Sequence, residues 1–373
     1  MQYMPIKHLV LPGGGAAAIR LLGALQKLHD NEIWNVKDIE SIHAVSAGTI
    51  IGVLIALKFD IETIVDYIIQ RPWGDVFKVS LTNIFDVFLK KGFFSSEMFV
   101  TFVKPFFDTK DISLDITLKD FYEITNVKLY FYTVELNSFQ LTQVSHETFP
   151  DLQVIKAVHM SAAYPVMVSP VIIDDKCYVD GGVICNYPIN YCTNMCPDKN
   201  EILGIGSEVK ATTKCITNES SIFEYLMELI YKMVRNIFGR VKDIENRQPV
   251  PNYVSIHIPS VTIGDIQDTF NDIELRKALL AEGAASAEDF LEDDTDCSTS
   301  VSDLSSSDLQ VCCGENNEGD ENNSHKTSNL SYDDGENKVV STTSGDQEKE
   351  ETSCSIKNSG SVTSFQSDMM PIY

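Results

Sequence analysis

Ser46 is the residue of this sequence whose surroundings best suit nucleophilic chemistry. It lies between Ala44 and Gly48 in the stretch 41–50, which has the pattern of a strand, a sharp turn and the start of a helix. A serine between small residues at such a turn is exposed to substrate, and the following helix points its N-terminus at the hydroxyl. The usual pattern is G-x-S-x-G, and Ala44 replaces its first glycine. The stretch predicts a nucleophile elbow.

A serine hydroxyl is a weak nucleophile unless a base removes its proton. Asp180 is the candidate base, because it ends the strand pattern of residues 178–180 and is followed by Gly181 and Gly182. The carboxyl end of a strand is where α/β sheets place their chemistry. We therefore expect Ser46 and Asp180 to act together.

The tetrahedral oxyanion that follows serine attack needs hydrogen-bond donors. An apolar strand over residues 8–11 runs into Pro12-Gly13-Gly14-Gly15 and then into an alanine-rich helix. Without β-carbons in the way, backbone N–H groups of this loop can approach a negative oxygen. The loop lacks the lysine and hydroxyl of a nucleotide site and has no G-x-G-x-x-G pattern. The three glycines are the predicted oxyanion hole, and a tight turn alone is the alternative.

The elements around these residues alternate between strands and helices, so the predicted fold class is α/β. A β-α-β-α order over the first seventy residues predicts a parallel sheet covered by helices. Further strands are predicted at residues 127–134, 140–144, 178–180, 201–206 and 253–258, and helices at residues 47–57, 60–70, 151–163, 220–242 and 272–291.

Composition divides the chain into a domain and a tail. Residues 291–373 hold 18 of the 54 acidic residues and only 4 of the 29 basic ones, and they are rich in Ser, Asn, Gly and Thr. Such a segment buries too little apolar surface to offset the chain entropy lost on folding. We expect a folded domain over residues 7–291 and a disordered acidic tail over residues 292–373. The acidic excess of the domain itself argues against nucleic acid as a partner.

Cysteine usage and the apolar runs predict a cytoplasmic protein. Nine cysteines without a regular framework indicate a reduced intracellular setting. Cys192 and Cys196 could chelate a metal, but no second pair stands at zinc spacing and no histidine follows closely, so no metal is expected. The N-terminal apolar run is too short for a signal peptide, and the run at residues 50–57 is about half a membrane span.

Residues 73–107 are unusually rich in phenylalanine, interspersed with lysines. Apolar positions at helical spacing are typical of core packing, and insertion into a membrane interface is the alternative. The cationic end of the helix predicted at residues 220–242 carries Lys232, Arg235, Arg240 and Lys242 and suggests peripheral contact with anionic lipid.

The glycine loop, the elbow serine and the D-G-G motif at residues 180–182 together resemble the patatin-like phospholipase family in order and spacing. The resemblance extends to Gly23, to S-A-A-Y-P at residues 161–165 and to N-Y-P at residues 186–188, and covers about residues 7–291. It implies a three-layer sandwich with a mainly parallel central sheet flanked by helices. It also implies a lipid acyl hydrolase of the phospholipase A or lysophospholipase type, with a Ser46–Asp180 dyad and no metal or cofactor. The substrate would be a phospholipid or another acyl-ester lipid at a membrane surface.

The loop departs from the family pattern, which usually continues G-G-G-x-[RK]-G. Ala17 and Ala18 occupy the last two of these positions, and the nearest basic residue is Arg20. We expect these changes, together with Ala44, to affect the reaction rate and the geometry of the loop more than the type of reaction.

Three other interpretations stay open. A catalytically weak or inactive patatin-like protein would bind lipid without turnover. An α/β-hydrolase esterase would use a triad of Ser46, Asp180 and His257, which have the right chain order, although several strands precede the elbow in that fold. A signalling or scaffold protein would function through the acidic tail. His43 and His159 lie in apolar stretches and are interpreted as structural residues with satisfied hydrogen bonds. The sequence does not specify the head group, the acyl position or the oligomeric state.

Overall fold

The computed structural model describes residues 5–77, 83–208, 215–245, 250–257 and 263–302. Its centre is an eight-stranded sheet formed by β1 (His8–Leu11), β2 (Ser41–Val45), β4 (Lys128–Glu135), β5 (Gln140–Ser145), β7 (Val171–Ile173), β8 (Lys176–Asp180), β9 (Ile202–Glu208) and β10 (Asn252–His257). The order is β10-β9-β1-β2-β4-β8-β7, with β5 beside β4. Neighbours from β10 to β4 are parallel, whereas β5 and β8 are antiparallel to β4 and β7 is antiparallel to β8.

Buried side chains alternate between the two faces of this sheet. Leu9 and Leu11 belong to the largest core, whereas Val10 packs on the opposite face against Ile189 and Cys192 of α8 (Ile189–Met195). The period of two along a strand produces this arrangement. The largest core takes side chains from α1 (Ile19–Asp30), α2 (Ala47–Ala56), α3 (Ile61–Gln70), α5 (Ser96–Thr109), α6 (Leu118–Thr125), α7 (Val154–Ala162), α10 (Ile263–Asn271) and α11 (Ile273–Ser302).

The predicted α/β class with a mainly parallel sheet flanked by helices is confirmed. Each strand predicted beyond residue 120 forms, with ends within about two residues of the expected ones. The sequence patterns did not predict β7, helix α8 or the small parallel sheet of β3 (Gly92–Phe94) and β6 (Val166–Val168). These elements are short, so their hydrophobic period is too brief to recognise.

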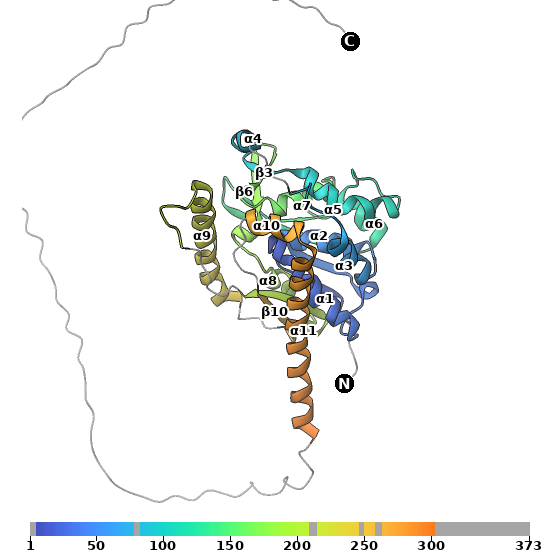
Figure 1. Cartoon of the computed structure of the whole chain (residues 1–373). Coiled ribbons are helices and arrows are strands. Elements are labelled where there is room, and N and C mark those ends of the chain that lie inside the picture. Colours follow the sequence, from blue (N-terminus) through green and yellow to red (C-terminus); the bar gives the residue numbers. More distant parts are fainter. Residues whose placement is uncertain (1–4, 78–82, 209–214, 246–249, 258–262, 303–373) are drawn as a thin grey trace, which may run out of the picture. The chain divides into compact units, whose positions relative to one another are not determined.

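The last helix, α11, lies along α1 (Figure 1). The two helices approach closely at Gly23 and Gly283, where an added β-carbon would collide with the backbone of Leu280 and Arg20 respectively. Helix α11 continues to Ser302, past its predicted end at residue 291. Residues 303–373 lie outside the described residues, so the domain boundary at 291 and the disordered tail stay predictions.

Most of the phenylalanines between residues 73 and 107 belong to the core, as their helical spacing indicated. Phe77, Phe99 and Phe102 are buried, and Phe77 stacks on Phe270 of α10. The exception among the described side chains is the end of α4 (Asn83–Lys90), where Phe88 is 80% exposed. Nowhere in the described ranges is a helix both long enough and apolar enough to span a bilayer.

Candidate active site

Ser46 forms a sharp turn between β2 and α2. Its backbone has φ 53° and ψ −129°, a left-handed conformation that is strained for any residue except glycine. The turn is tight because α2 begins against the loop after β1: a β-carbon on Gly48 would lie 2.6 Å from the carbonyl oxygen of Pro12. Ala44, which replaces the first glycine of the usual elbow pattern, is fully buried in the largest core. Its methyl group packs there and does not prevent the turn at Ser46.

The sheet register brings Ser46 to Asp180. Strand β5 occupies one edge of β4, whereas β2 and β8 share the other edge, β2 along its first part and β8 along its last. Because β2 is parallel to β4 and β8 is antiparallel, their carboxyl ends point at each other. Strand β2 ends opposite Tyr132, and Asp180 lies opposite Thr133, the next residue. Ser46 follows β2 directly and therefore meets the Asp180 carboxylate.

The Asp180 carboxylate is almost completely removed from solvent, with 1% of its surface exposed. Its Oδ1 accepts a hydrogen bond of 2.7 Å from the Gly182 N–H, while its Oδ2 is buried without a regular hydrogen bond and is available to the Ser46 hydroxyl. Burial raises the pKa of Asp180 to about 7, although hydrogen bonding by Ser46 and Gly182 lowers it. A carboxylate whose pKa lies near neutrality suits a general base.

Ser161 supports both the elbow and the strand next to it. The Ser46 N–H donates to Ser161 Oγ at 3.1 Å, and the Ser161 hydroxyl donates to the Tyr132 carbonyl at 2.6 Å. Gly181 packs against the same carbonyl, where a β-carbon would collide. The S-A-A-Y-P motif at residues 161–165 contains this serine, but nothing in the sequence assigns it a contact with the elbow.

Asn186 holds the glycine loop against the segment after Asp180. The Gly13 N–H donates to Asn186 Oδ1 at 3.0 Å, and Asn186 Nδ2 donates back to the Gly13 carbonyl at 3.1 Å. Gly13 itself touches the nucleophile, since a β-carbon there would lie 2.7 Å from Ser46 Cβ. One of the three predicted oxyanion amides is thus engaged by a side chain. Gly14 and Gly15 lead into the 3-10 turn η1 (Gly15–Ala18), and the first N–H groups of a helical turn have no partner within it.

Replacing Asn186 with alanine is expected to loosen this loop. Two hydrogen bonds to the loop backbone are lost, which costs about 1–3 kcal/mol of stability. Because the loop borders Ser46, kcat should fall by about tenfold or more while KM changes little. Urea unfolding and steady-state kinetics on a soluble ester measure the two effects. The control is Asn200→Ala, whose side chain bonds Asp198 at the surface; equal kcat for the two variants would contradict the role of Asn186.

The missing cation of the glycine loop is not replaced by Arg20. Ala17 and Ala18 are buried in the core, and the Arg20 Nε donates to Glu282 of α11 at 2.7 Å. An oxyanion beside Ser46 would therefore face the backbone N–H groups of Gly14 and Gly15 and the N-terminus of α2, without a cation from the loop.

The three histidines singled out by the sequence occupy different environments. His257 lies on β10, three strand spacings or about 14 Å across the sheet from β2. His159 Nε2 is bonded to the Ser169 carbonyl at 2.8 Å, as expected for a structural histidine. His43 Nδ1 pairs with the Tyr132 hydroxyl at 2.8 Å, whereas its Nε2 is buried without a regular hydrogen bond and the ring lies near the Cys196 thiol.

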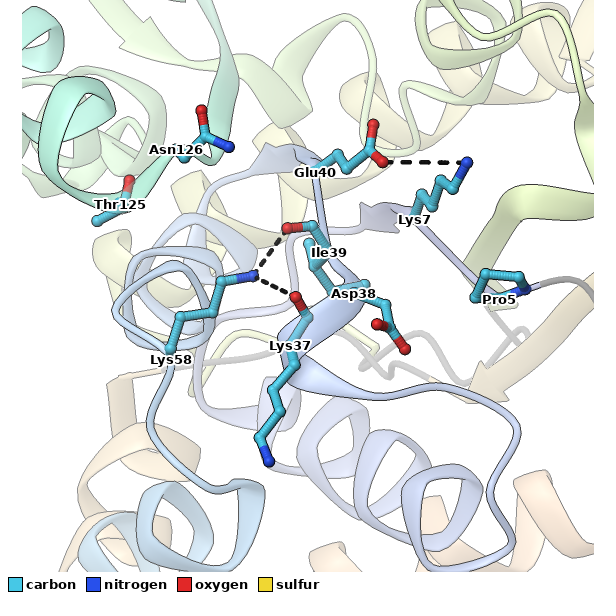
Figure 2. Close-up of a pocket in the computed structure, with 9 residues that line it drawn as sticks. All are labelled: Pro5, Lys7, Lys37, Asp38, Ile39, Glu40, Lys58, Thr125 and Asn126. Carbon is cyan, nitrogen blue, oxygen red and sulfur yellow. Dashed lines mark hydrogen bonds and ion pairs between the residues drawn. The ribbon is translucent and has the colours of Figure 1, made fainter.

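A pocket of about 390 Å³, whose lining residues are labelled in Figure 2, precedes strands β1, β2 and β4 and so lies at the opposite end of the sheet from Ser46. Its walls include residues just before the strands, among them Lys7 and Glu40, which form an ion pair of 3.9 Å. The Lys58 ammonium donates to the carbonyls of Val36 and Ile39, both at 2.8 Å, and so stabilises the segment that forms one wall of the pocket. Because α/β sheets place their chemistry at the carboxyl ends of strands, this pocket is not the candidate site.

Comparison with known proteins gives one family match and several relatives. Residues 9–193 match the model of the family described as patatin-like phospholipase. A probable lipid hydrolase, 463L, of Invertebrate iridescent virus 6 is 27% identical over 197 residues, which cover 52% of this chain and 66% of that protein. The uncharacterized protein R571 of Acanthamoeba polyphaga mimivirus is 27% identical over 239 residues, or 62% of this chain and 77% of that protein. The crystal structure of VipD from Legionella pneumophila has 18% identity and a TM-score of 0.44, over 77% of this chain and 67% of VipD.

Proposed function

Because this chain belongs to the patatin-like phospholipase family, we propose that it is a lipid acyl hydrolase that cleaves fatty-acyl esters with a dyad of Ser46 and Asp180. The observation that carries the proposal is the meeting of a strained elbow serine with a fully buried carboxylate. A base with a pKa of about 7 is ionised in a large fraction of molecules at neutral pH and is basic enough to accept a proton from a hydroxyl.

Acylation begins when the Ser46 hydroxyl attacks the carbonyl carbon of the ester and its proton passes to Asp180. The tetrahedral oxyanion is stabilised by the N–H groups of Gly14 and Gly15 and by the N-terminus of α2. The intermediate then collapses, and the leaving alcohol takes the proton from Asp180. This alcohol is a lysophospholipid when the substrate is a phospholipid, and the head-group part when the substrate is a lysophospholipid. An acyl-Ser46 ester remains.

Deacylation repeats these steps with water as the nucleophile. Asp180 takes a proton from water, the resulting hydroxide attacks the acyl-Ser46 carbonyl, and the oxyanion again lies at the glycine loop. Collapse releases the fatty acid and returns the proton to Ser46. The dyad needs no histidine, because one carboxylate carries the proton in both halves of the reaction.

The experiment that tests the function is fatty-acid release from mixed phospholipid vesicles by the purified full-length protein. We expect release that Ser46→Ala abolishes, with lysophospholipid as the second product. Vesicle binding without release by the unmodified protein would support the alternative of a lipid-binding protein that does not turn over.

Hydrolysis is expected to continue in the presence of a calcium chelator. Within the described part of the chain, the group with metal-ligand geometry consists of one imidazole and two thiols, which do not suit calcium. The oxyanion donors are backbone amides, so the reaction has no step for calcium to assist. The measurement compares rates with chelator and with added calcium; loss of turnover that calcium restores would overturn the dyad mechanism.

Exposed apolar side chains on α4 and α9 (Ile222–Glu245) are the proposed contact with the lipid surface. Phe88 and Leu89 at the end of α4 are 80% and 78% exposed. On α9, exposed apolar side chains recur at helical spacing and form one face, which consists of Ile222, Leu226, Leu229 and Met233. An apolar face of this kind partitions into a membrane interface. The side chains of Arg235, Arg240 and Lys242, which the sequence assigned to this contact, lie outside the described residues.

Replacing Phe88 and Leu89 together with serine should weaken binding to phospholipid vesicles by about tenfold or more, since each buried side chain contributes about 1.5–3 kcal/mol. Co-sedimentation measures the effect. Ile124→Ser is the matched control, because Ile124 is 57% exposed on α6. An equal loss of binding in the two variants would remove the assigned role of α4.

A further inference from the structure

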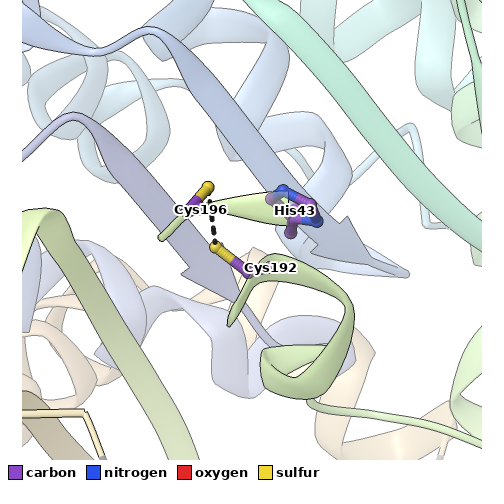
Figure 3. Close-up of side chains that lie close together, drawn as sticks. All are labelled: His43, Cys192 and Cys196. Atoms are coloured by element: carbon purple, nitrogen blue, oxygen red, sulfur yellow. Dashed lines mark hydrogen bonds between the residues drawn. The ribbon is translucent and has the colours of Figure 1, made fainter. Parts of the chain in front are cut away.

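His43, Cys192 and Cys196 lie close together on the face of the sheet that α8 covers (Figure 3). His43 comes from β2, Cys192 from α8, and Cys196 follows the end of that helix. All three side chains are buried, and their ligand atoms lie within 4.8 Å of one another. We propose that they form a structural zinc site that joins the strand of the nucleophile to helix α8.

The separation of the two sulfur atoms matches a metal site. Each sulfur of a tetrahedral zinc site lies about 2.3 Å from the metal, which places two sulfurs about 3.8 Å apart. The Cys192 and Cys196 sulfurs are 3.9 Å apart. A disulfide would require them to approach to about 2.05 Å. An imidazole nitrogen belongs about 3.6 Å from each sulfur, so closing the site needs shifts of at most about 1 Å.

His43 has the hydrogen-bond pattern of a metal ligand. Its Nδ1 is paired with the Tyr132 hydroxyl at 2.8 Å, while its Nε2 is buried and has no hydrogen-bond partner. A ligating histidine commonly uses its second nitrogen in this way, which fixes the ring and its tautomer. An orphaned buried nitrogen costs free energy, and a metal ion would satisfy it.

Charge and surroundings also suit zinc. Two thiolates balance the charge of Zn²⁺, so the occupied site is neutral and can remain among Val10, Ile189 and Val250. Binding releases the two thiol protons to solvent. Thiolate and imidazole together select zinc over the hard cations magnesium and calcium. The three side chains provide three of the four ligands of a tetrahedral site, and a water molecule is the candidate for the fourth.

The alternative is a pair of neutral thiols joined by a weak S–H···S hydrogen bond. That arrangement accounts for the sulfur contact, and it leaves the Cys196 S–H free to turn toward His43. It also takes up no metal, and this difference separates the two states experimentally.

The test is titration of the reduced, metal-free, full-length protein with Co²⁺ and then with Zn²⁺. We expect one equivalent of Co²⁺ to produce the charge-transfer absorption of two thiolate ligands, and one equivalent of Zn²⁺ to remove it. In weak buffer, the unmodified protein should release about two protons per Zn²⁺ bound. Its melting temperature should rise by several degrees with zinc. Unmodified protein that binds no Co²⁺, or that binds without releasing protons, overturns the proposal whether or not any variant folds.

Variants then locate the site. Replacing Cys192 and Cys196 together with alanine should abolish the thiolate absorption and lower zinc affinity at least a hundredfold. His43→Ala should keep the two-thiolate absorption and lower affinity about tenfold or more. The matched control replaces Cys177 and Cys215, two free cysteines elsewhere in the described chain, and should bind zinc like the unmodified protein. Full binding by the Cys192 and Cys196 variant would also refute the assignment.

Discussion

Ser46→Ala and Asp180→Asn will each reduce ester hydrolysis by about four orders of magnitude or more, and combining them will cost no more than either change alone. In the proposed mechanism, Ser46 supplies the attacking oxygen, and Asp180 supplies the base that faces it from the end of β8. Neither group can act without the other, so their contributions do not add. The measurement is single-turnover and steady-state release of fatty acid by the two single variants and the double variant, with circular dichroism to check that each is folded.

His257→Ala is the control that separates the dyad from a triad. His257 lies about 14 Å across the sheet from the nucleophile strand, so its removal should leave the rate nearly unchanged. A loss as large as that of Ser46→Ala would replace the dyad with an α/β-hydrolase triad. A double variant that is much slower than both single variants would show that Ser46 and Asp180 act independently.

The sequence identified the candidate dyad because both residues sit in short local motifs. Small residues around Ser46 predict a turn, and the glycines after Asp180 predict a strand end, so each part can be recognised in a few residues. The contact between them depends on long-range register. Strands β2 and β8 must share one edge of β4 with opposite directions, and no local pattern specifies strand order.

The supporting residues were missed for the same reason. Asn186 bonds a loop 173 positions earlier in the chain, and Ser161 bonds an elbow 115 positions earlier. For Cys192 and Cys196, a zinc motif recognisable in the sequence needs a histidine that follows closely along the chain, and none does. His43 reaches Cys192 and Cys196 from a strand far upstream, because β2 lies beneath α8 in the folded sheet. Residue spacing can therefore reveal metal ligands that are close together in the sequence. It cannot reveal ligands that are far apart in the sequence and meet only in the folded protein.

Asp180→Asn is expected to stabilise the protein at neutral pH while it abolishes hydrolysis. An aspartate has an ordinary pKa of 3.8, and burial raises the pKa of Asp180 to about 7. Between these values the folded protein holds a proton that the unfolded chain has released. Stability therefore falls as the pH rises from about 4 to about 7 and levels off above that. At 1.36 kcal/mol per pKa unit, the loss at neutral pH is about 4 kcal/mol.

An asparagine cannot ionise, so Asp180→Asn should lack this loss, and its stability relative to the unmodified protein should grow across the same pH range. Ser46→Ala should act in the other direction. The Ser46 hydrogen bond lowers the pKa of Asp180, so its removal raises that pKa further and extends the falling part of the stability curve to higher pH. Urea unfolding of the three proteins from pH 4 to 8.5 measures these differences, and effects of other titrating groups cancel in the comparison. If the free energy of unfolding changed with pH in the same way for the unmodified protein and Asp180→Asn, Asp180 would already be ionised at low pH. The same carboxylate would then be too weak a base for Ser46, since the burial that costs stability is what gives Asp180 its basicity.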